Sequence, residues 1–335
     1  MHSALCTSPM IGAVIALTSA FCFALSDVFV RRGVTKAPVS YGAFVTVLLG
    51  VPLFAIGALL FGQLLRVGEI SGEGYLYLIA AGIIHYVIGR YFNYAAINAM
   101  GATRAAPVQA LGLPYSVLIA FLFLDEGVTL GMGAGIALIM VGPLLMVERR
   151  RQPSPVAAAV IEGADADTAN APILPEPVPG SVAQPFVLRQ TEGYFFAVIA
   201  AISYGSSPVL IRAAIGGDPD VSILGGLVTY IAAAVVLLAS LILPARRPLL
   251  KALNVPTFQI FFGAGFAVFL AQMFRFIALS EASVAVVATL LRFGSVFTLI
   301  LSWYFNKHLE NINWRVVAGV ILSVAGAILI IGFQE

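Results

Sequence analysis

Ten apolar stretches, each about as long as a bilayer is thick, constrain the fold of this chain more than any other feature. A transmembrane helix needs about 20 apolar residues. Stretches of that length lie near residues 9–30, 38–63, 74–98, 102–124, 129–147, 192–212, 221–243, 257–279, 283–304 and 314–333. Only 10% of the residues are charged, too few to cover a water-exposed surface. The sequence therefore predicts an all-α membrane protein with ten transmembrane helices, and it excludes a soluble enzyme or a nucleic-acid-binding domain.

One segment, residues 149–190, interrupts this pattern. It is rich in Pro and Ala and has no amphipathic period, so we expect a disordered linker between two halves, 1–148 and 191–335. Of the 18 Lys and Arg residues, 13 lie in this linker or in the other loops on its side of the membrane. The positive-inside rule predicts a multi-pass protein of the cell inner membrane, with the linker in the cytoplasm and both termini outside.

The two halves carry similar landmarks in the same order. Ala13-Val14-Ile15-Ala16 recurs as Ala197-Val198-Ile199-Ala200, and Gly135 with Gly142 recurs as Gly319 with Gly326. Each half holds five spans, an odd number, so the second half must cross the membrane in the opposite direction. Two inverted five-helix repeats are typical of secondary transporters, whose halves rock around a site near the midplane.

Further marks lie around the fourth and fifth spans. They are Gly101-Ala102-Thr103-Arg104-Ala105-Ala106, Leu122-Phe123-Leu124-Asp125-Glu126, and the pair Gly135 and Gly142. With these marks the chain resembles the ten-helix EamA-type transporters of the drug/metabolite transporter superfamily. The second half departs from the family pattern, because its acid, Glu310, arrives about one helical turn late. The resemblance implies export or exchange of small metabolites, often amino acids, without an ATPase domain.

Three arginines lie inside predicted spans: Arg90, Arg275 and Arg292. A charged side chain at the centre of a membrane helix costs about 3 kcal/mol on insertion scales, so such residues are candidates for function. The spans offer few acids to balance them, since we expect Asp27 to pair with Arg31. Guanidinium groups match carboxylate and phosphate oxygens in a bidentate fashion. The three arginines therefore indicate an anionic or carboxylate-bearing substrate.

Polar neighbours on the same helix faces extend this candidate site. In the third span, Tyr86, Arg90, Asn93 and Tyr94 recur at α-helical spacing, and in the eighth span Gln272 lies three residues before Arg275. The predicted substrate-binding residues are Arg90, Tyr94, Asn93, Tyr86, Gln272, Arg275 and Arg292. Gln109 and Tyr204 are weaker candidates, and His85 is expected to be structural, with a proton-relay role as the alternative. Pro208 marks the sixth span as a candidate hinge.

The function predicted is secondary transport of small anionic or zwitterionic metabolites, such as amino acids or organic acids, by alternating access. The expected partners are the substrate and the lipid bilayer, with a coupling proton and a homodimer left open. No nucleic acid, metal or cofactor is expected. One alternative is export of cationic drugs, which would need a midplane acid, for which Asp27 is the candidate. The other is a membrane enzyme acting on lipid, which would need a nucleophile, a metal cluster or paired carboxylates.

Overall fold

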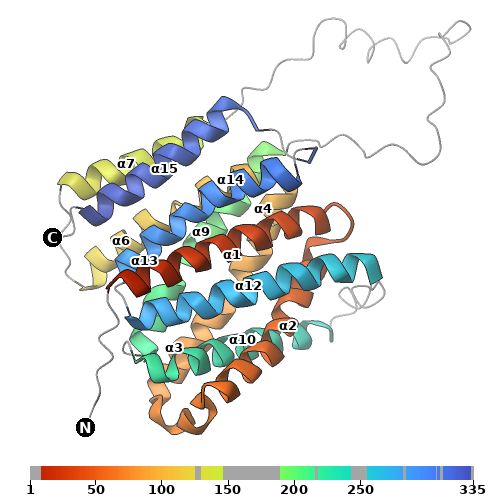
Figure 1. The fold of residues 1–335 in the computed structure, drawn as a ribbon, viewed down its shortest axis with the longest axis vertical. Helices are drawn as coiled ribbons and strands as arrows, with labels where there is room; N and C mark the ends of the chain where they lie inside the picture. The colour runs from red at the N-terminus through yellow and green to blue at the C-terminus, as the bar shows by residue number, and fades with distance from the viewer. Residues whose placement is uncertain are drawn as a thin grey trace, which may run out of the picture.

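The computed structural model describes residues 9–124, 130–145, 189–215, 218–242, 255–281, 284–306, 308–309 and 312–332. Nearly all of these residues are helical (Figure 1). The first half contains α1 (Pro9–Gly33), α2 (Val39–Leu60), α3 (Gly72–Gly82), α4 (Arg90–Met100), α5 (Ala102–Gln109), α6 (Gly112–Leu124) and α7 (Leu130–Leu145). The second contains α9 (Gln190–Ile215), α10 (Ser222–Ser240), α12 (Val255–Glu281), α13 (Val284–Leu290), α14 (Gly294–Phe305) and α15 (Trp314–Gly332).

These helices account for all ten predicted spans, although three spans are interrupted. The third runs from α3 through a π-helical segment, η2 (Ile83–Gly89), into α4. The fourth is divided into α5 and α6, and the ninth is α13, a 3₁₀ turn η6 (Leu291–Phe293) and α14. Most of the predicted linker, together with Asp125, Glu126 and Glu310, lies outside the described residues.

The packing partners of the helices follow an inverted-repeat arrangement. The first helix of the first half, α1, packs on α12, and the first helix of the second half, α9, packs on α3, η2 and α4. Likewise α1 packs on α14 while α9 packs on α6. The pairs α2 with α10 and α7 with α15 each join equivalent helices of the two halves (Figure 1). Exchanging the halves therefore reproduces the contacts, as a pseudo-twofold axis in the membrane plane requires.

Glycines bring α7 and α15 into close contact at one edge of the bundle. A Cβ atom on Gly142 would lie 2.7 Å from the carbonyl oxygen of Gly319, and one on Gly326 would lie 2.5 Å from that of Gly135. Small residues at such spacing let helix backbones approach each other closely in membranes. The glycines that mark the repeat in the sequence thus lie where α7 and α15 pair with each other, along the edge visible in Figure 1.

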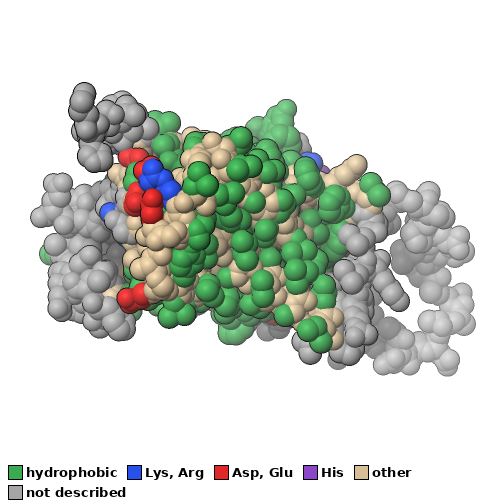
Figure 2. Space-filling view, turned by 90° about the horizontal axis from the view of Figure 1, so that it is seen from below, with side chains coloured by type: hydrophobic (Ala, Val, Ile, Leu, Met, Phe, Trp, Pro, Cys, Tyr) green, Lys and Arg blue, Asp and Glu red, His purple; other side chains and the backbone are tan. Residues whose placement is uncertain are grey.

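The flank of the molecule is apolar, as a multi-pass membrane protein requires. Within the described residues, seven helices are long and apolar enough to cross a membrane, and residues 133–142 and 314–329 form shorter apolar helices. Large apolar side chains such as Leu60, Trp303 and Ile321 are exposed on this flank. In Figure 2 hydrophobic side chains cover most of the described surface on this face, and charged ones gather near one end. The exposed apolar surface is the part that lipid would cover.

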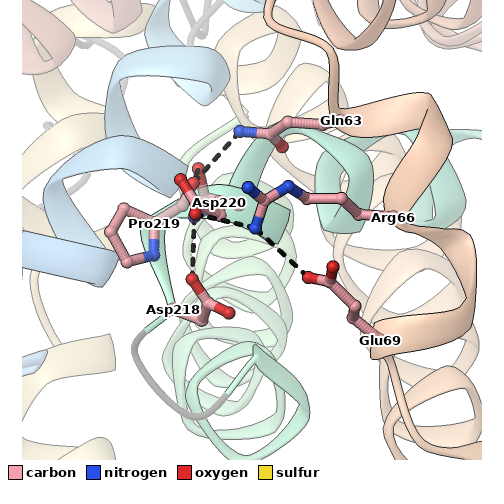
Figure 3. A network of polar contacts seen from close by, with 7 residues as sticks. Gln63, Arg66, Glu69, Asp218, Pro219 and Asp220 are labelled. Carbon is pink, nitrogen blue, oxygen red and sulfur yellow. Dashed lines mark hydrogen bonds and ion pairs between the residues drawn. The ribbon is translucent and has the colours of Figure 1, made fainter. Parts of the chain in front are cut away.

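A polar clamp joins the two halves at the end of the bundle where α2 ends. The Gln63 side chain donates to the Pro219 carbonyl (3.1 Å) and accepts from the backbone N–H groups of Ile223 (2.8 Å) and Leu224 (3.0 Å). Beside it, Arg66 forms an ion pair with Asp220 at 2.7 Å (Figure 3). One half thus caps the start of α10, which belongs to the other half.

A second clamp joins the halves at the opposite end, where α1 ends. The buried Asn306 side chain accepts from Nε of Arg32 (2.7 Å) and donates to the Val28 carbonyl (2.9 Å). The neighbouring Arg31 donates to the carbonyls of Ile97 (3.2 Å) and Leu309 (2.7 Å). Buried hydrogen bonds therefore hold the two halves together at both ends of the bundle.

Candidate functional site

A central cavity lies between the two halves. Its volume is about 140 Å³, which is large enough for a small organic molecule. Helices from both halves line it, namely α1, α4, α5 and α6 from the first and α9, α12, α13 and α14 from the second. Its polar lining residues are Ser26, Asp27, His85, Arg90, Asn93, Tyr94, Gln109, Ser116, Tyr204, Gln272, Arg275, Arg292, Ser295 and Thr298.

The structure brings most of the predicted site residues together around this cavity. Six of the seven line it: Arg90, Asn93, Tyr94, Gln272, Arg275 and Arg292. The weaker candidates Gln109 and Tyr204 line it as well. Tyr86 does not; it is buried behind the lining, with its ring 4.2 Å from that of Tyr230 and 4.7 Å from the Arg90 guanidinium carbon.

The π-helical segment explains why His85 replaces Tyr86 at the cavity. At α-helical spacing, Tyr86 and Arg90 share a face because they lie four residues apart. In η2 the turn is widened, so residues five apart come into line instead, and His85 is five residues before Arg90. His85 accordingly lines the cavity together with Arg90. The apolar sequence around His85 gave no sign of a π-helix. The sequence therefore predicted Tyr86 at the cavity, where the structure has the preceding residue, His85.

Arg90 is held firmly by its neighbours. Its Nη2 donates to the Tyr230 hydroxyl at 2.8 Å and its Nη1 to the Thr46 hydroxyl at 3.4 Å. Its guanidinium carbon lies over the ring of Tyr230 at 5.3 Å, in addition to that of Tyr86, and the residue is only 2% exposed. Cation–π contacts and hydrogen bonds to hydroxyls offset the cost of burying this charge. Arg90 thus supplies a fixed positive potential at the wall of the cavity.

Arg275 is held less completely. Its Nε donates to Oε1 of Gln272 at 2.8 Å, and its Nη1 lies 3.5 Å from the Ser207 hydroxyl. Within the described residues its Nη2 is buried and makes no hydrogen bond, and the same is true of the Tyr86 hydroxyl, which lies close enough to Arg275 to interact with it. Leaving a charged donor buried and unpaired is costly, and binding an acceptor would recover that cost. Arg275 therefore keeps one guanidinium donor that makes no hydrogen bond within the described residues.

Arg292 lies where the fourth and ninth spans are broken. It belongs to η6, and its Nη1 donates to the carbonyl of Gln109, the last residue of α5, at 3.1 Å. The cation thus sits at the carboxyl end of a half-helix, where the helix dipole favours positive charge. Discontinuous helices at equivalent positions of two inverted repeats are typical of substrate sites at the membrane midplane. The broken spans are the fourth and ninth, whereas α9, which contains Pro208, is continuous.

Two amides and one carboxylate also line the cavity. The Asn93 side chain donates to Oδ1 of Asp27 at 3.5 Å and accepts from Nε2 of Gln109 at 2.5 Å. The Tyr94 hydroxyl donates to the Thr46 hydroxyl at 3.2 Å. From the sequence, Asp27 was expected to pair with Arg31 and was also the candidate midplane acid for a cation exporter. In the structure Asp27 is one of the residues that line the cavity.

The charges of the lining residues decide what the cavity can bind. Among the described lining residues, three carry guanidinium groups and one, Asp27, carries a carboxylate. The sum of these charges is positive, so the lining gives the cavity a positive electrostatic potential. The described residues also contain no cluster of three His, Cys, Asp or Glu side chains that could hold a metal ion.

Comparisons with known proteins agree with this architecture. The model of the EamA-like transporter family matches residues 10–148 and 191–332. Among curated proteins, the chain is similar to an uncharacterized transporter in the cobO 3' region of a Sinorhizobium species, 28% identical over 131 residues, which make up 39% of this chain and 92% of that protein. That relative is therefore about as long as one half of this chain. A crystal structure of a protein aligns over 96% of both chains with a TM-score of 0.57 and 15% identity, which is a likeness of fold alone.

Proposed function

The chain belongs to the EamA-like transporter family, and we propose that it is a secondary transporter of small anionic or zwitterionic metabolites that works by alternating access. The proposed substrates are amino acids or organic acids. The family and the transporter-named relative already indicate a transporter rather than an enzyme. The proposal adds the charge of the substrate and the mechanism, alternating access, by which the substrate crosses the membrane.

The single observation that carries the substrate class is the buried, unpaired Nη2 of Arg275 at the cavity wall. A carboxylate placed there would accept from this donor, while Arg90 would add a positive potential from the α4 side. Arg–carboxylate hydrogen bonds are about twice as strong as neutral ones. A zwitterion would in addition place its ammonium group beside Asp27, the carboxylate in the same lining.

Export of cationic drugs is the second candidate, and the presence of Asp27 in the lining is the observation that favours it. One carboxylate facing three guanidinium groups leaves the site positive, which repels a guest that carries only a cation. A zwitterion satisfies both signs. The charge balance of the lining therefore supports the anionic or zwitterionic class over the cationic one.

Alternating access is supported by the arrangement of the two halves. The cavity lies between inverted repeats, and hydrogen-bonded clamps join the halves at both ends of the bundle. Opening one clamp at a time would expose the cavity to one side of the membrane and then to the other. We propose that the protein lies in the cell inner membrane, with the predicted linker in the cytoplasm.

Uptake by reconstituted protein tests this proposal. Proteoliposomes would be supplied with radiolabelled succinate, L-glutamate and L-alanine, and with choline and tetraethylammonium as cations. We expect uptake of at least one carboxylate and of neither cation. In Arg275→Gln, which keeps one polar donor group but removes the charge, we expect uptake to fall by about 100-fold, because a desolvated charged partner of a carboxylate contributes about 3 kcal/mol.

Arg189→Gln is the matched control. Arg189 is exposed and forms an ion pair with Glu192 at 2.9 Å, outside the cavity. This variant should transport as the wild type does, since exposed ion pairs contribute little. Uptake of the cations by the wild type, or full uptake of carboxylates by a folded Arg275→Gln variant, would contradict the proposed substrate class.

A further inference from the structure

Four polar side chains form a closed ring at the wall of the cavity. Nδ1 of His85 lies 2.7 Å from the Ser207 hydroxyl, and its Nε2 lies 2.9 Å from Nε2 of Gln272. Gln272 accepts from Nε of Arg275 at 2.8 Å, and Nη1 of Arg275 lies 3.5 Å from the same Ser207 hydroxyl. All four residues are buried, and they come from η2, α9 and α12. The ring therefore joins both halves of the molecule.

The donors and acceptors of this ring determine the state of His85. A guanidinium group only donates, so Gln272 must turn its oxygen toward Arg275. The NH₂ group of Gln272 then points at Nε2 of His85, which must accept and therefore carries no proton. The proton of the neutral imidazole is left on Nδ1, from which it donates to Ser207. The ring is complete only when His85 is neutral.

A proton on Nε2 of His85 would rearrange the ring. His85 would then donate on both sides, and Gln272 could satisfy it only by turning its oxygen from Arg275 to the imidazole. The NH₂ group of Gln272 would face Nε of Arg275, and two donors cannot bond each other. Protonation of His85 thus removes the acceptor that occupies Nε of Arg275.

Freeing Nε changes what Arg275 can bind. In an arginine side chain, Nε and Nη2 point in parallel along one edge of the guanidinium plane and together receive the two oxygens of a carboxylate. Nη2 is already without a partner, so release of Nε would complete this bidentate edge. A proton on His85 would therefore improve the site for a carboxylate.

The charges around His85 also link its protonation to the binding of a carboxylate. Arg275 on α12 and Arg90 on α4 line the same cavity as His85, and their positive charges both oppose a third positive charge on His85. From α9 it meets the ring of Tyr204 at 4.5 Å and Ser207, and on its own element it meets Tyr86, which packs on Tyr230 of α10. Thr46 of α2 contributes an uncharged hydroxyl, which accepts from Arg90. Asp27 of α1 contributes a carboxylate to the lining that contains His85. A bound carboxylate would offset the positive charge that opposes protonation.

From this ring we propose that His85 binds the coupling proton and that the protein carries its carboxylate together with that proton. The inference rests on the proposed function, since it presumes a carboxylate on Arg275. Proton and carboxylate each make the other bind more tightly, because linkage between two ligands is reciprocal. No bond is made or broken in the step except that of the proton, which arrives from water in the cavity and leaves to water on the other side.

Proton movement during uptake tests this inference. Proteoliposomes with a pH-sensitive dye inside would be supplied with succinate, L-glutamate or L-alanine, whichever the wild type carries. We expect the lumen to acidify with uptake, and the KM for uptake to fall at least about fivefold between pH 7.5 and 5.5, the lower end of ordinary coupling energies. His85→Gln places an oxygen where Nε2 lies, so it can accept from Gln272 but does not titrate. It should exchange the carboxylate without acidification and with a KM that does not change with pH.

The outcomes separate this inference from the proposed function. If the wild type carries none of the carboxylates, the proposed function fails. If it carries one without acidification, or if His85→Gln still acidifies the lumen, the coupling role of His85 is refuted while the proposed function stands.

A second measurement covers the case in which His85→Gln does not fold. The chain has three histidines, so His2→Gln combined with His308→Gln leaves His85 alone for ¹⁵N spectroscopy of the imidazole. We expect the neutral Nδ1–H form at pH 7 and a larger protonated fraction at pH 5.5 when the carboxylate is added. A protonated fraction that the carboxylate does not change would refute the inference.

Discussion

Each of the three membrane-embedded arginines is buried in a different way, and the difference decides its role. Arg90 is held by two hydroxyls and two aromatic rings. Arg292 donates to backbone carbonyls at a helix break. Arg275 depends on an amide and has a donor to spare. The protein thus offsets the cost of the buried charge with contacts at Arg90 and Arg292, and it does so less completely at Arg275.

Removing one hydroxyl tests how Arg90 is held. In Tyr230→Phe the Nη2 group of Arg90 loses its partner while the ring contact stays, so we expect the free energy of unfolding to fall by about 1.5–3 kcal/mol. Tyr304→Phe is the control, because Tyr304 is 73% exposed on α14 and should change stability little. Denaturant unfolding in micelles measures both. Equal stability of the two variants would show that Tyr230 does not support Arg90.

The sequence indicated most of the site at this scale because charge inside an apolar span is rare and visible. Arg90, Arg275 and Arg292 were found in that way, and α-helical spacing then brought in Asn93 and Gln272. His85 was assigned a structural role, because a single histidine among apolar residues gives no sign of what it faces. Its ring partner Ser207 was missed because a serine in a membrane helix is common and its contact lies across two elements.

At the scale of the element, small residues determine which helices can meet. Gly142 of α7 lies against Gly319 of α15, and Gly82 of α3 would place a Cβ 2.3 Å from the Thr229 carbonyl oxygen of α10. Glycines at near-heptad spacing mark the helix faces that make the first contact, although they do not indicate which helix is the partner. The second was not, because one glycine in an apolar helix has no pattern. The π-helix and the division of the fourth span likewise follow from packing across elements rather than from local sequence.

Two glycines of α7 provide a matched test of this packing. A methyl group at Gly142 would lie 2.7 Å from the Gly319 oxygen and 2.8 Å from the Ser323 hydroxyl, whereas one at Gly133 would meet nothing within 4 Å. We expect Gly142→Ala to lower the free energy of unfolding by about 1–3 kcal/mol, the usual cost of overpacking. Gly133→Ala should leave it unchanged or raise it by up to about 1 kcal/mol, because alanine is the better helix former. If both variants lost the same free energy of unfolding, the loss would come from a change within α7 and not from the contact between α7 and α15.

At the scale of the whole molecule, the two clamps are the parts that alternating access would have to break in turn. Gln63 caps α10 at one end, and Asn306 holds the end of α1 at the other. Both are single amide side chains that bridge the two halves. The inverted repeat could be predicted from landmarks such as Gly135 and Gly319. The clamps could not, because neither amide has a neighbour in sequence that marks its partner.

Accessibility of the cavity tests whether the clamps act in opposite senses. Ser295→Cys places a thiol in the cavity lining, with Cys6 and Cys22 replaced by alanine. A membrane-impermeant thiol reagent would be applied from the side where Gly68→Cys reacts, since Gly68 is exposed in the 3₁₀ helix Gln63–Glu69 that begins at the clamp residue. Adding Gln63→Ala should raise the labelling rate of Ser295→Cys from that side about fivefold or more, since it removes three hydrogen bonds of about 1 kcal/mol each from one closed state.

Asn306→Ala should have the opposite effect from the same side. It loosens the far clamp, so the population shifts toward the form open at the far side, and the labelling rate of Ser295→Cys should fall below that of the parent. A general loosening of the bundle would raise the rate in both variants, and a rigid cavity would raise it in neither. Only two states that exchange one closed end for the other give changes of opposite sign. Those signs, rather than the size of either effect, therefore decide whether the pseudo-symmetric halves rock about the cavity.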